Sequence, residues 1–419
     1  MTSKTVSSPG SASTFNRPLG VFEHIFWLRG QINAVHFLVA GEVEGATAPE
    51  EWRTALDAIQ KRHPLLSVRI VQKDDTSVWF EHRAESPIPL RLVTGDGLFR
   101  WEEELEKELS VPFDTQEAPL VRAVLIHYPD RCIVILAAHH SVGDGLSLSY
   151  IIRDLLAALS GRTLTPFPFP ASTDELLGLT AGPEKGLLKG PPLVNGRAGP
   201  NRLWESTQKV PRVHTRRLAP PFIDRLVKRS REEGTTLNGA LVSSLVTASR
   251  RLFPRWGKKP VRVLSPISVR KTFGLGEDCR LSLSAKIMPF PPEESRPFWN
   301  LARFIRSSVA EAGKLETINE DMRGLRNFVG GKDLAGVGPL LERFERELLV
   351  SNLGRLEYGT DFGRVRLASV WGPIMYSGSE DDYFVGVCTV DRNCFLTITS
   401  RAPNGQQLLN ESLKLLAGA

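Results

Sequence analysis

One segment constrains the fold of this chain more than any other: an apolar run of strand length that ends in two histidines and leads into a helical pattern. The run is Cys132–Ala138, and apolar residues at helical spacing extend over Leu146–Leu159. Between them lies His139-His140-Ser141-Val142-Gly143-Asp144-Gly145. The run is far shorter than the roughly 20 residues of a membrane-spanning helix. The chain must therefore fold around a strand, a polar turn and a helix.

The rest of the first half alternates between strand-like and helix-like patterns. We expect helices from about 47 and around 98–109, and strands over 35–43, 66–71, 78–82, 89–93 and 121–127. The first of these helices begins with a capping box, Thr47-x-x-Glu50. No repeat with a period of about 20–50 residues is visible. This alternation predicts a mixed α/β fold.

Prolines recur between about Thr163 and Pro211 and interrupt regular structure there. We therefore predict a disordered tail over 1–15, an N-terminal domain over 16–162, a proline-rich linker over 163–211 and a C-terminal domain over 212–419. The last of these is expected to contain helices over 221–233, 236–252, 298–312 and 406–416, and strands over 261–264, 281–287, 349–352, 384–390 and 395–400. The helix over 236–252 is apolar or small on nearly every side, which predicts burial.

The histidine turn has the residue types that proton abstraction needs. An imidazole at the end of a strand can take a proton from a hydroxyl, amine or thiol near pH 7. Gly143 and Gly145 permit a tight backbone path that aims the ring. Asp144 can lock the turn, either by pairing with an arginine or by accepting backbone N–H groups. The chain has no Gly-x-Ser-x-Gly elbow, P-loop or dinucleotide fingerprint that competes with this motif.

The histidine pair has two other interpretations. Adjacent histidines on a strand point to opposite faces and cannot readily bind one metal ion, so we predict no metal site. A purely structural role is the default for a lone histidine at a strand end. The Asp-Gly pair and the strand–turn–helix context favour chemistry instead.

The motif His139-His140-x-x-x-Asp144-Gly145 resembles that of the acyltransferases related to chloramphenicol acetyltransferase. This superfamily includes nonribosomal peptide condensation domains, polyketide-associated acyltransferases, alcohol acetyltransferases and the plant BAHD enzymes. Further matches follow in the expected order: Arg62–Leu66, Phe113-Asp114 with Pro119–Arg122, Pro266–Arg270, Val350–Gly354 and Asp361–Gly363. The BAHD pattern Asp-Phe-Gly-Trp-Gly is broken here by Arg364 and Val365, which argues against a plant-type enzyme.

The resemblance implies two chloramphenicol acetyltransferase-like domains that form a V-shaped cleft, with the active site in a tunnel at their interface. His140 would be the general base, and His139 a packed residue at the strand end. Asp144, followed by Gly145, would form an ion pair with Arg270 that holds the loop. Ser351 and Asn352 would either donate to a tetrahedral oxyanion or form an ordinary turn.

The resemblance also implies direct transfer of an acyl group from a thioester to a hydroxyl or amine of a small-molecule acceptor. Acyl-coenzyme A or a phosphopantetheinyl thioester would be the co-substrate, with no bound cofactor and with any acyl-carrier protein acting in trans. No acyl-enzyme is expected, because no activated Ser or Cys is apparent. The alternatives are a stand-alone condensation enzyme that forms an amide between carrier-bound substrates and a catalytically silent module that docks a carrier. The family suggests secondary metabolism or lipid biosynthesis.

The charge of the chain is unevenly distributed. Residues 1–150 hold 14 Lys and Arg against 20 Asp and Glu, whereas residues 151–419 hold 39 against 27. The basic second half indicates an anionic partner, such as a phosphorylated thioester carrier, or a solvated surface without a partner. Nucleic acid is not expected, because no nucleic-acid-binding motif is present. Four cysteines without a C-x-x-C pair and no apolar signal segment indicate a reduced cytoplasmic protein, which we expect to be a monomer.

Overall fold

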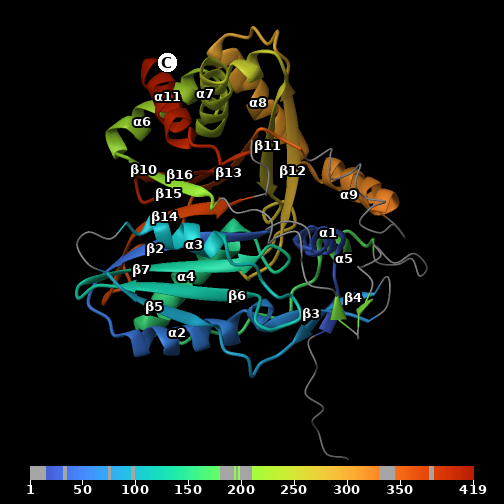
Figure 1. The fold of residues 1–419 in the computed structure, drawn as a ribbon, viewed down its shortest axis with the longest axis vertical. Helices are drawn as coiled ribbons and strands as arrows, with labels where there is room; N and C mark the ends of the chain where they lie inside the picture. Colours follow the sequence, from blue (N-terminus) through green and yellow to red (C-terminus); the bar gives the residue numbers. More distant parts are fainter. Residues whose placement is uncertain are drawn as a thin grey trace, which may run out of the picture.

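Two large β-sheets organise the computed structural model, which describes residues 16–31, 35–73, 77–95, 100–179, 193–194, 197–198, 210–329, 345–376 and 382–419. The predicted tail over 1–15 and much of the predicted linker over 163–211 lie outside these residues. Helices and strands alternate along the chain in both halves (Figure 1). The predicted mixed α/β fold is confirmed.

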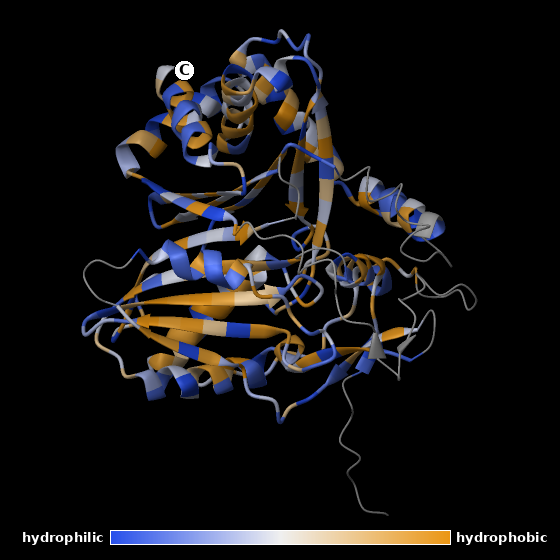
Figure 2. Ribbon diagram, in the orientation of Figure 1, coloured by the Kyte–Doolittle hydropathy of each residue, from blue (hydrophilic) through white to orange (hydrophobic). Residues whose placement is uncertain are grey.

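The first sheet has five strands in the order β14-β2-β7-β6-β5. They are β2 (His36–Glu44), β5 (Leu90–Thr94), β6 (Val121–His127), β7 (Arg131–His139) and β14 (Arg366–Met375). All neighbours run antiparallel except β5 and β6, which are parallel. The apolar residues of β6 and β7, which Figure 2 shows as largely orange strands, are buried on both faces of the sheet. Such double burial explains why these strands are continuous apolar runs and not alternating ones.

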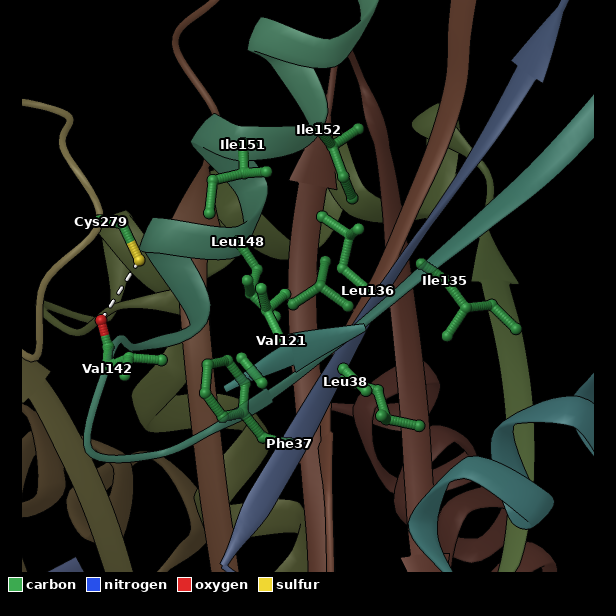
Figure 3. Close-up of a cluster of buried hydrophobic side chains, with 14 of the residues drawn as sticks. Phe37, Leu38, Val121, Ile135, Leu136, Val142, Leu148, Ile151, Ile152 and Cys279 are labelled. Atoms are coloured by element: carbon green, nitrogen blue, oxygen red, sulfur yellow. Dashed lines mark hydrogen bonds between the residues drawn. The ribbon is translucent and has the colours of Figure 1, made fainter. Parts of the chain in front are cut away.

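Two helices, α2 (Pro49–Arg62) and α4 (Gly145–Leu159), pack against each other beside this sheet, and α4 contacts β2 and β14. Figure 3 shows side chains of α4 meeting apolar side chains of β2, β6 and β7. Gly41 in β2 allows this approach, since a Cβ there would lie 3.0 Å from Ile152 Cγ2. The strand that ends in the histidines is thus held in a packed core.

The second sheet has six strands in the order β10-β16-β15-β13-β11-β12. They are β10 (Arg212–Leu218), β11 (Val261–Ser268), β12 (Leu283–Phe290), β13 (Leu348–Arg355), β15 (Tyr383–Val390) and β16 (Asn393–Ser400). Its helices are α6 (Pro220–Glu232), α7 (Leu237–Leu252), α8 (Phe298–Ala312) and α11 (Gly405–Gly418), at the top of Figure 1. Helix α7 packs against α8 and α11, and most of its residues are buried, as its composition predicts.

Strand β14 links the two sheets. It comes from the second half of the sequence, yet it pairs with β2 of the first sheet and also contacts β15 and β16 of the second. The approach is close: a Cβ on Gly386 of β15 would lie 1.9 Å from the Pro373 carbonyl oxygen of β14. The predicted division into two domains at the proline-rich segment stays a prediction. Strand β14 belongs by sequence to the predicted C-terminal domain, yet it completes the sheet of the N-terminal one.

The remaining elements surround these sheets. Strands β1 (Asn16–Pro18), β3 (Val68–Gln72) and β4 (Val78–His82) form a small sheet, and β8 (Leu193–Val194) pairs with β9 (Arg197–Ala198). The helices are α1 (Val21–Gly30), α3 (Glu102–Leu109), α5 (Thr173–Leu176) and α9 (Leu315–Val329), with short 3₁₀ turns η1 (Pro64–Ser67) and η3 (Pro254–Gly257). Within the described ranges, no helix has the length and apolar character needed to cross a membrane.

One local prediction is wrong. The capping box of α2 is not formed by Thr47 and Glu50, because the helix begins one residue later, with Ala48 as its N-cap. Glu51 accepts a hydrogen bond from the Ala48 amide at 2.7 Å, and Pro49 occupies the first helical position. The Thr47 hydroxyl instead accepts a hydrogen bond from the Trp52 indole at 3.0 Å. Proline at the first helical position decides the start.

Candidate active site

His140 follows the last residue of β7 and lines a cavity to which both halves of the sequence contribute. Its ring stacks on Phe26 of α1, with centroids 4.1 Å apart and planes 10° apart, and it also contacts Phe37 of β2. The Nδ1 atom is shielded from solvent and has no hydrogen-bond partner of good geometry among the described residues. The ring therefore reaches the cavity through its Nε2 edge.

Burial lowers the pKa of His140 to about 4. The charge of Arg29 acts in the same direction as burial, whereas the carbonyl groups of His140 and Gly143 and the carboxylate of Asp144 act in the opposite direction. Burial dominates because the free energy lost when an imidazolium is removed from water exceeds the stabilisation that these contacts provide. At neutral pH the ring is consequently uncharged and has a nitrogen able to accept a proton.

His139 lies on the other side of the strand end. It is 3% exposed, its Nδ1 accepts a hydrogen bond from the Ser141 amide at 3.2 Å, and its ring packs edge-on against Phe113. Burial lowers its pKa to about 3. His139 does not line the cavity. Successive side chains of a strand point to opposite faces, which explains why His140 lines the cavity and His139 does not.

Asp144 caps the first turn of α4. Its Oδ1 accepts a hydrogen bond from the Ser147 amide at 2.8 Å, and its Oδ2 accepts one from the Ser282 amide at 3.0 Å. The carboxylate thus fixes both the helix start and the segment that leads into β12. Of the two roles left open by the sequence, pairing with an arginine or accepting backbone N–H groups, Asp144 performs both, because Arg270 also reaches it.

Arg270 extends from the segment after β11 and is 5% exposed. Its Nη2 lies 3.5 Å from Asp144 Oδ1 and 2.9 Å from Ser147 Oγ, while its Nη1 donates to the Gly276 carbonyl at 2.6 Å. These contacts join the histidine turn to the 270–280 segment over a sequence separation of more than a hundred residues. Arg270 does not line the cavity itself.

Two further contacts hold the same segment against the turn. The Cys279 thiol donates to the Val142 carbonyl at 3.2 Å, drawn as a dashed line in Figure 3. The Cys279 amide donates to His63 Nδ1 at 3.1 Å, and His63 Nε2 lies 3.0 Å from the Asp154 carboxylate. His63 is fully buried, which lowers its pKa, and the Asp154 carboxylate acts in the opposite direction. The stretch Arg62–Leu66 therefore contributes to the site by anchoring the loop.

The glycines of the turn serve close approach. Neither Gly143 nor Gly145 has a positive φ. A Cβ on Gly145 would lie 2.4 Å from Pro373 Cγ and 2.8 Å from Leu353 Cδ2, so a larger residue would push β14 and β13 away. A Cβ on Gly143 would lie 3.2 Å from the Cys279 sulfur. Glycine is needed here for space and not for a left-handed backbone.

Ser351 and Asn352 lie on β13, and both line the cavity. The Asn352 side chain is committed locally: its Oδ1 accepts from the Gly354 amide at 2.8 Å and its Nδ2 donates to Asn238 Oδ1 at 3.3 Å. These two bonds hold the Asn352 side chain at the point where the register of β13 becomes irregular, and the role of either residue as an oxyanion donor stays a prediction.

The rest of the cavity wall is largely apolar, and sequence patterns did not single it out. The cavity has a volume of about 170 Å³, and its wall includes Phe22, Ile25, Phe26, Phe37, Leu349 and Phe384. Arg29, Arg346 and Ser282 add polar groups. Helix α1, which supplies several of these residues, contains apolar residues on most sides, so its periodicity carries no clear signal. The described residues contain no group of His, Cys, Asp and Glu arranged to hold a metal ion.

Comparison with known proteins finds one family model that matches part of the chain. Residues 28–170, which contain the complete histidine turn, match the family model of the Condensation domain. The predicted resemblance to the superfamily that includes condensation domains is confirmed by this match, which covers about a third of the chain. It is 25% identical over 288 residues to a plipastatin synthase protein of Bacillus subtilis, a match that covers 65% of this chain and 8% of that protein. The chain thus spans only a small part of this curated relative.

Solved structures show the same fold over nearly the whole chain. Polyketide synthase associated protein 5 from Mycobacterium tuberculosis aligns with a TM-score of 0.65 at 16% identity, covering 97% of this chain and 98% of that one. The epimerization domain from the third module of tyrocidine synthetase B aligns with a TM-score of 0.62 at 16% identity, covering 98% of each chain. Proteins with different names therefore share this architecture, so the reaction has to be inferred from the residues of the site.

Proposed function

We propose that this chain is an acyltransferase that moves an acyl group from a thioester directly to a hydroxyl or amine, with His140 as the general base. The observation that carries the proposal is a neutral, half-buried imidazole at the wall of an apolar cavity, held by a turn that Asp144 and Arg270 lock. A neutral imidazole in a site with little water can accept a proton from an acceptor held within about 3 Å.

The proposed reaction proceeds through one tetrahedral intermediate. His140 takes the proton of the acceptor hydroxyl or amine as its oxygen or nitrogen attacks the thioester carbonyl carbon. The carbonyl oxygen gains the negative charge, and Ser351 is the proposed donor to it. Collapse of the intermediate breaks the carbon–sulfur bond, and the leaving thiolate takes the proton back from the imidazolium. The products are an ester or amide and a free thiol.

The cavity also supports the proposed location of the reaction. Its wall combines residues of α1, β2 and the histidine turn with residues of β11, β12, β13, β14 and β15. Such a shared wall fits a V-shaped cleft with a tunnel between two domains, in which donor and acceptor enter from opposite faces. We propose coenzyme A or a phosphopantetheinyl carrier acting in trans as the thiol component of the donor.

A stand-alone condensation enzyme is the second candidate, and the match to the Condensation domain model favours it. In that case both substrates are carrier-bound and the product is an amide. The same histidine would deprotonate the acceptor amine, so the site geometry fits both reactions. They differ in whether free coenzyme A thioesters and small free acceptors suffice.

The test is intact-mass analysis of products after incubation with a panel of acyl-coenzyme A and acyl-carrier thioesters, each combined with alcohols and amines. A new ester or amide from free substrates supports the acyltransferase. Product formed only when both substrates are carrier-bound supports the condensation enzyme. Absence of product from every combination, with a folded protein, supports a catalytically silent carrier-docking module and contradicts the proposal.

A further inference from the structure

Two arginines lie in the wall of the His140 cavity, and neither acts in the proposed reaction. Arg29 belongs to the last turn of α1, and Arg346 precedes β13. Arg346 is 9% exposed and forms an ion pair with the similarly buried Asp382, with Nη2 and Oδ2 3.2 Å apart. One positive charge of the cavity is thus balanced by a nearby carboxylate.

Arg29 has no such partner among the residues that the structure describes. No hydrogen bond or ion pair joins its guanidinium to any of them, although the guanidinium groups of arginines that are shielded from water are usually paired. The carboxylate that lines the cavity, Asp144, is already held by Arg270 and by two backbone amides. Among the described residues, the cavity therefore carries one positive charge that no acidic group pairs with.

Keeping this charge in place has a cost. Burial, with the nearby charge of Arg346, lowers the pKa of Arg29 to about 10, while Asp382 acts in the opposite direction. The guanidinium remains charged at neutral pH. The last turn of a helix stabilises a cation. This stabilisation does not explain why Arg29 faces a cavity, because an exposed arginine at the same helix end would gain it too.

We propose that the cavity binds a substrate that bears a carboxylate and that Arg29, assisted by Arg346, is the residue that recognises it. This inference rests on the proposed function. It takes the bound molecule to be the acceptor or the acyl group, with its reacting end next to His140. A guanidinium binds a carboxylate through two parallel hydrogen bonds, and the apolar wall strengthens them by excluding water. A cavity of about 170 Å³ holds a group of roughly the size of a benzene ring.

Substrate binding would then also tune the base. The charge of Arg29 is one of the influences that lower the pKa of His140. A carboxylate beside Arg29 offsets that charge, so the imidazole becomes more basic when the substrate is bound. Substrates without the carboxylate would lose this effect along with the contact.

The experiment measures binding by calorimetry, with benzoate and its uncharged analogue benzamide as probes. We expect benzoate to bind the wild-type protein at least about tenfold more tightly than benzamide. The variant Arg29→Gln should bind both equally, and Arg29→Lys should keep part of the preference. The control Arg225→Gln removes the same charge from an exposed position on α6 and should leave the preference unchanged. The thermal midpoint of each variant reports whether it is folded.

Other outcomes overturn the inference. Equal binding of benzoate and benzamide, no binding of benzoate, or a preference that survives in a folded Arg29→Gln protein would each do so. Pantetheine 4′-phosphate provides a further arm: if its affinity falls in Arg29→Gln while that of benzoate does not, the arginine serves the donor phosphate and not a carboxylate. Because the assay needs no turnover, failure of acyl transfer would contradict the proposed function and leave this result standing.

Discussion

Arg270 Nη2 lies 2.9 Å from Ser147 Oγ and 3.5 Å from Asp144 Oδ1, so the hydroxyl is the closer of its two partners. The same hydroxyl lies 2.9 Å from Asp144 Oδ1. The link between the histidine turn and the 270–280 segment is therefore a three-residue cluster and not a simple ion pair. Its members are buried, so loss of one leaves polar groups without partners.

We expect Asp144→Ala and Arg270→Ala each to lower the free energy of unfolding by about 3–5 kcal/mol, as is usual when one partner of a buried pair is removed. The double variant should lose much less than the sum, because the remaining charge is removed as well. Urea denaturation measures all three. The exposed pair Arg366 and Glu44 is the matched control, with an expected coupling of at most about 1 kcal/mol. Additive losses at Asp144 and Arg270 would contradict the cluster.

The histidine pair should separate into a catalytic and a packed residue. His140→Ala should lower kcat by about 10²–10⁴-fold with little change in thermal midpoint, the usual effect of losing a general base. His139→Ala should act mainly through stability, since His139 is buried away from the cavity. Turnover and thermal midpoint of both variants are measured under identical conditions. Near-normal turnover of a folded His140→Ala protein would remove the general-base assignment.

The pH dependence follows from the lowered pKa of His140. The neutral ring is the active form, and with a pKa of about 4 it stays neutral until the pH falls toward that value. We expect kcat/KM to be level from about pH 7.5 to about 5 and to fall below that, whereas an unperturbed histidine would give a limb near about 6.5. Circular dichroism at each pH is needed, because buried neutral histidines also reduce stability as the pH drops below about 6.5. An acid limb near about 6.5 in a folded protein would contradict the neutral buried state.

Ser351 and Asn352 should differ in the same assay. Ser351→Ala removes the proposed oxyanion donor and should lower kcat by about 10²-fold or more, with little change in the KM of either substrate. Asn352→Ala should act through stability, because its side chain bonds Gly354 and Asn238. Steady-state kinetics with the best substrate pair decides. If Ser351→Ala keeps full kcat, the oxyanion is stabilised by another group.

The basic second half of the chain gives a prediction about salt. If its positive charge contacts donor phosphates or an acidic carrier, added salt should raise the KM for the donor more than that for the acceptor. The comparison uses sodium chloride from low to physiological ionic strength and a neutral acceptor. A donor KM that does not change with salt would assign the charge to an ordinary solvated surface.

Much of the local structure could be predicted from the sequence. The strands Val78–His82 and Val121–His127 and the helix Phe298–Ala312 have the predicted bounds, because their apolar spacing and flanking turn residues lie within the segment itself. The position of the histidine motif between a buried strand and a helix could be predicted for the same reason, because the signals lie within that segment. Even so, the start of α2 depended on Pro49, a signal that the Thr47 pattern obscured.

The site needed the tertiary structure. Strand β14 was not predicted, because its partner β2 lies more than three hundred residues away and only the pairing identifies it. Arg29 carries no local signal either: its significance arises where α1, β13 and the histidine turn enclose one cavity. The sequence by itself determined which residues have the chemistry, since side-chain types and short spacings are written in it. Only the fold decided which charges are buried and balanced, because desolvation and contact are properties of the packed chain.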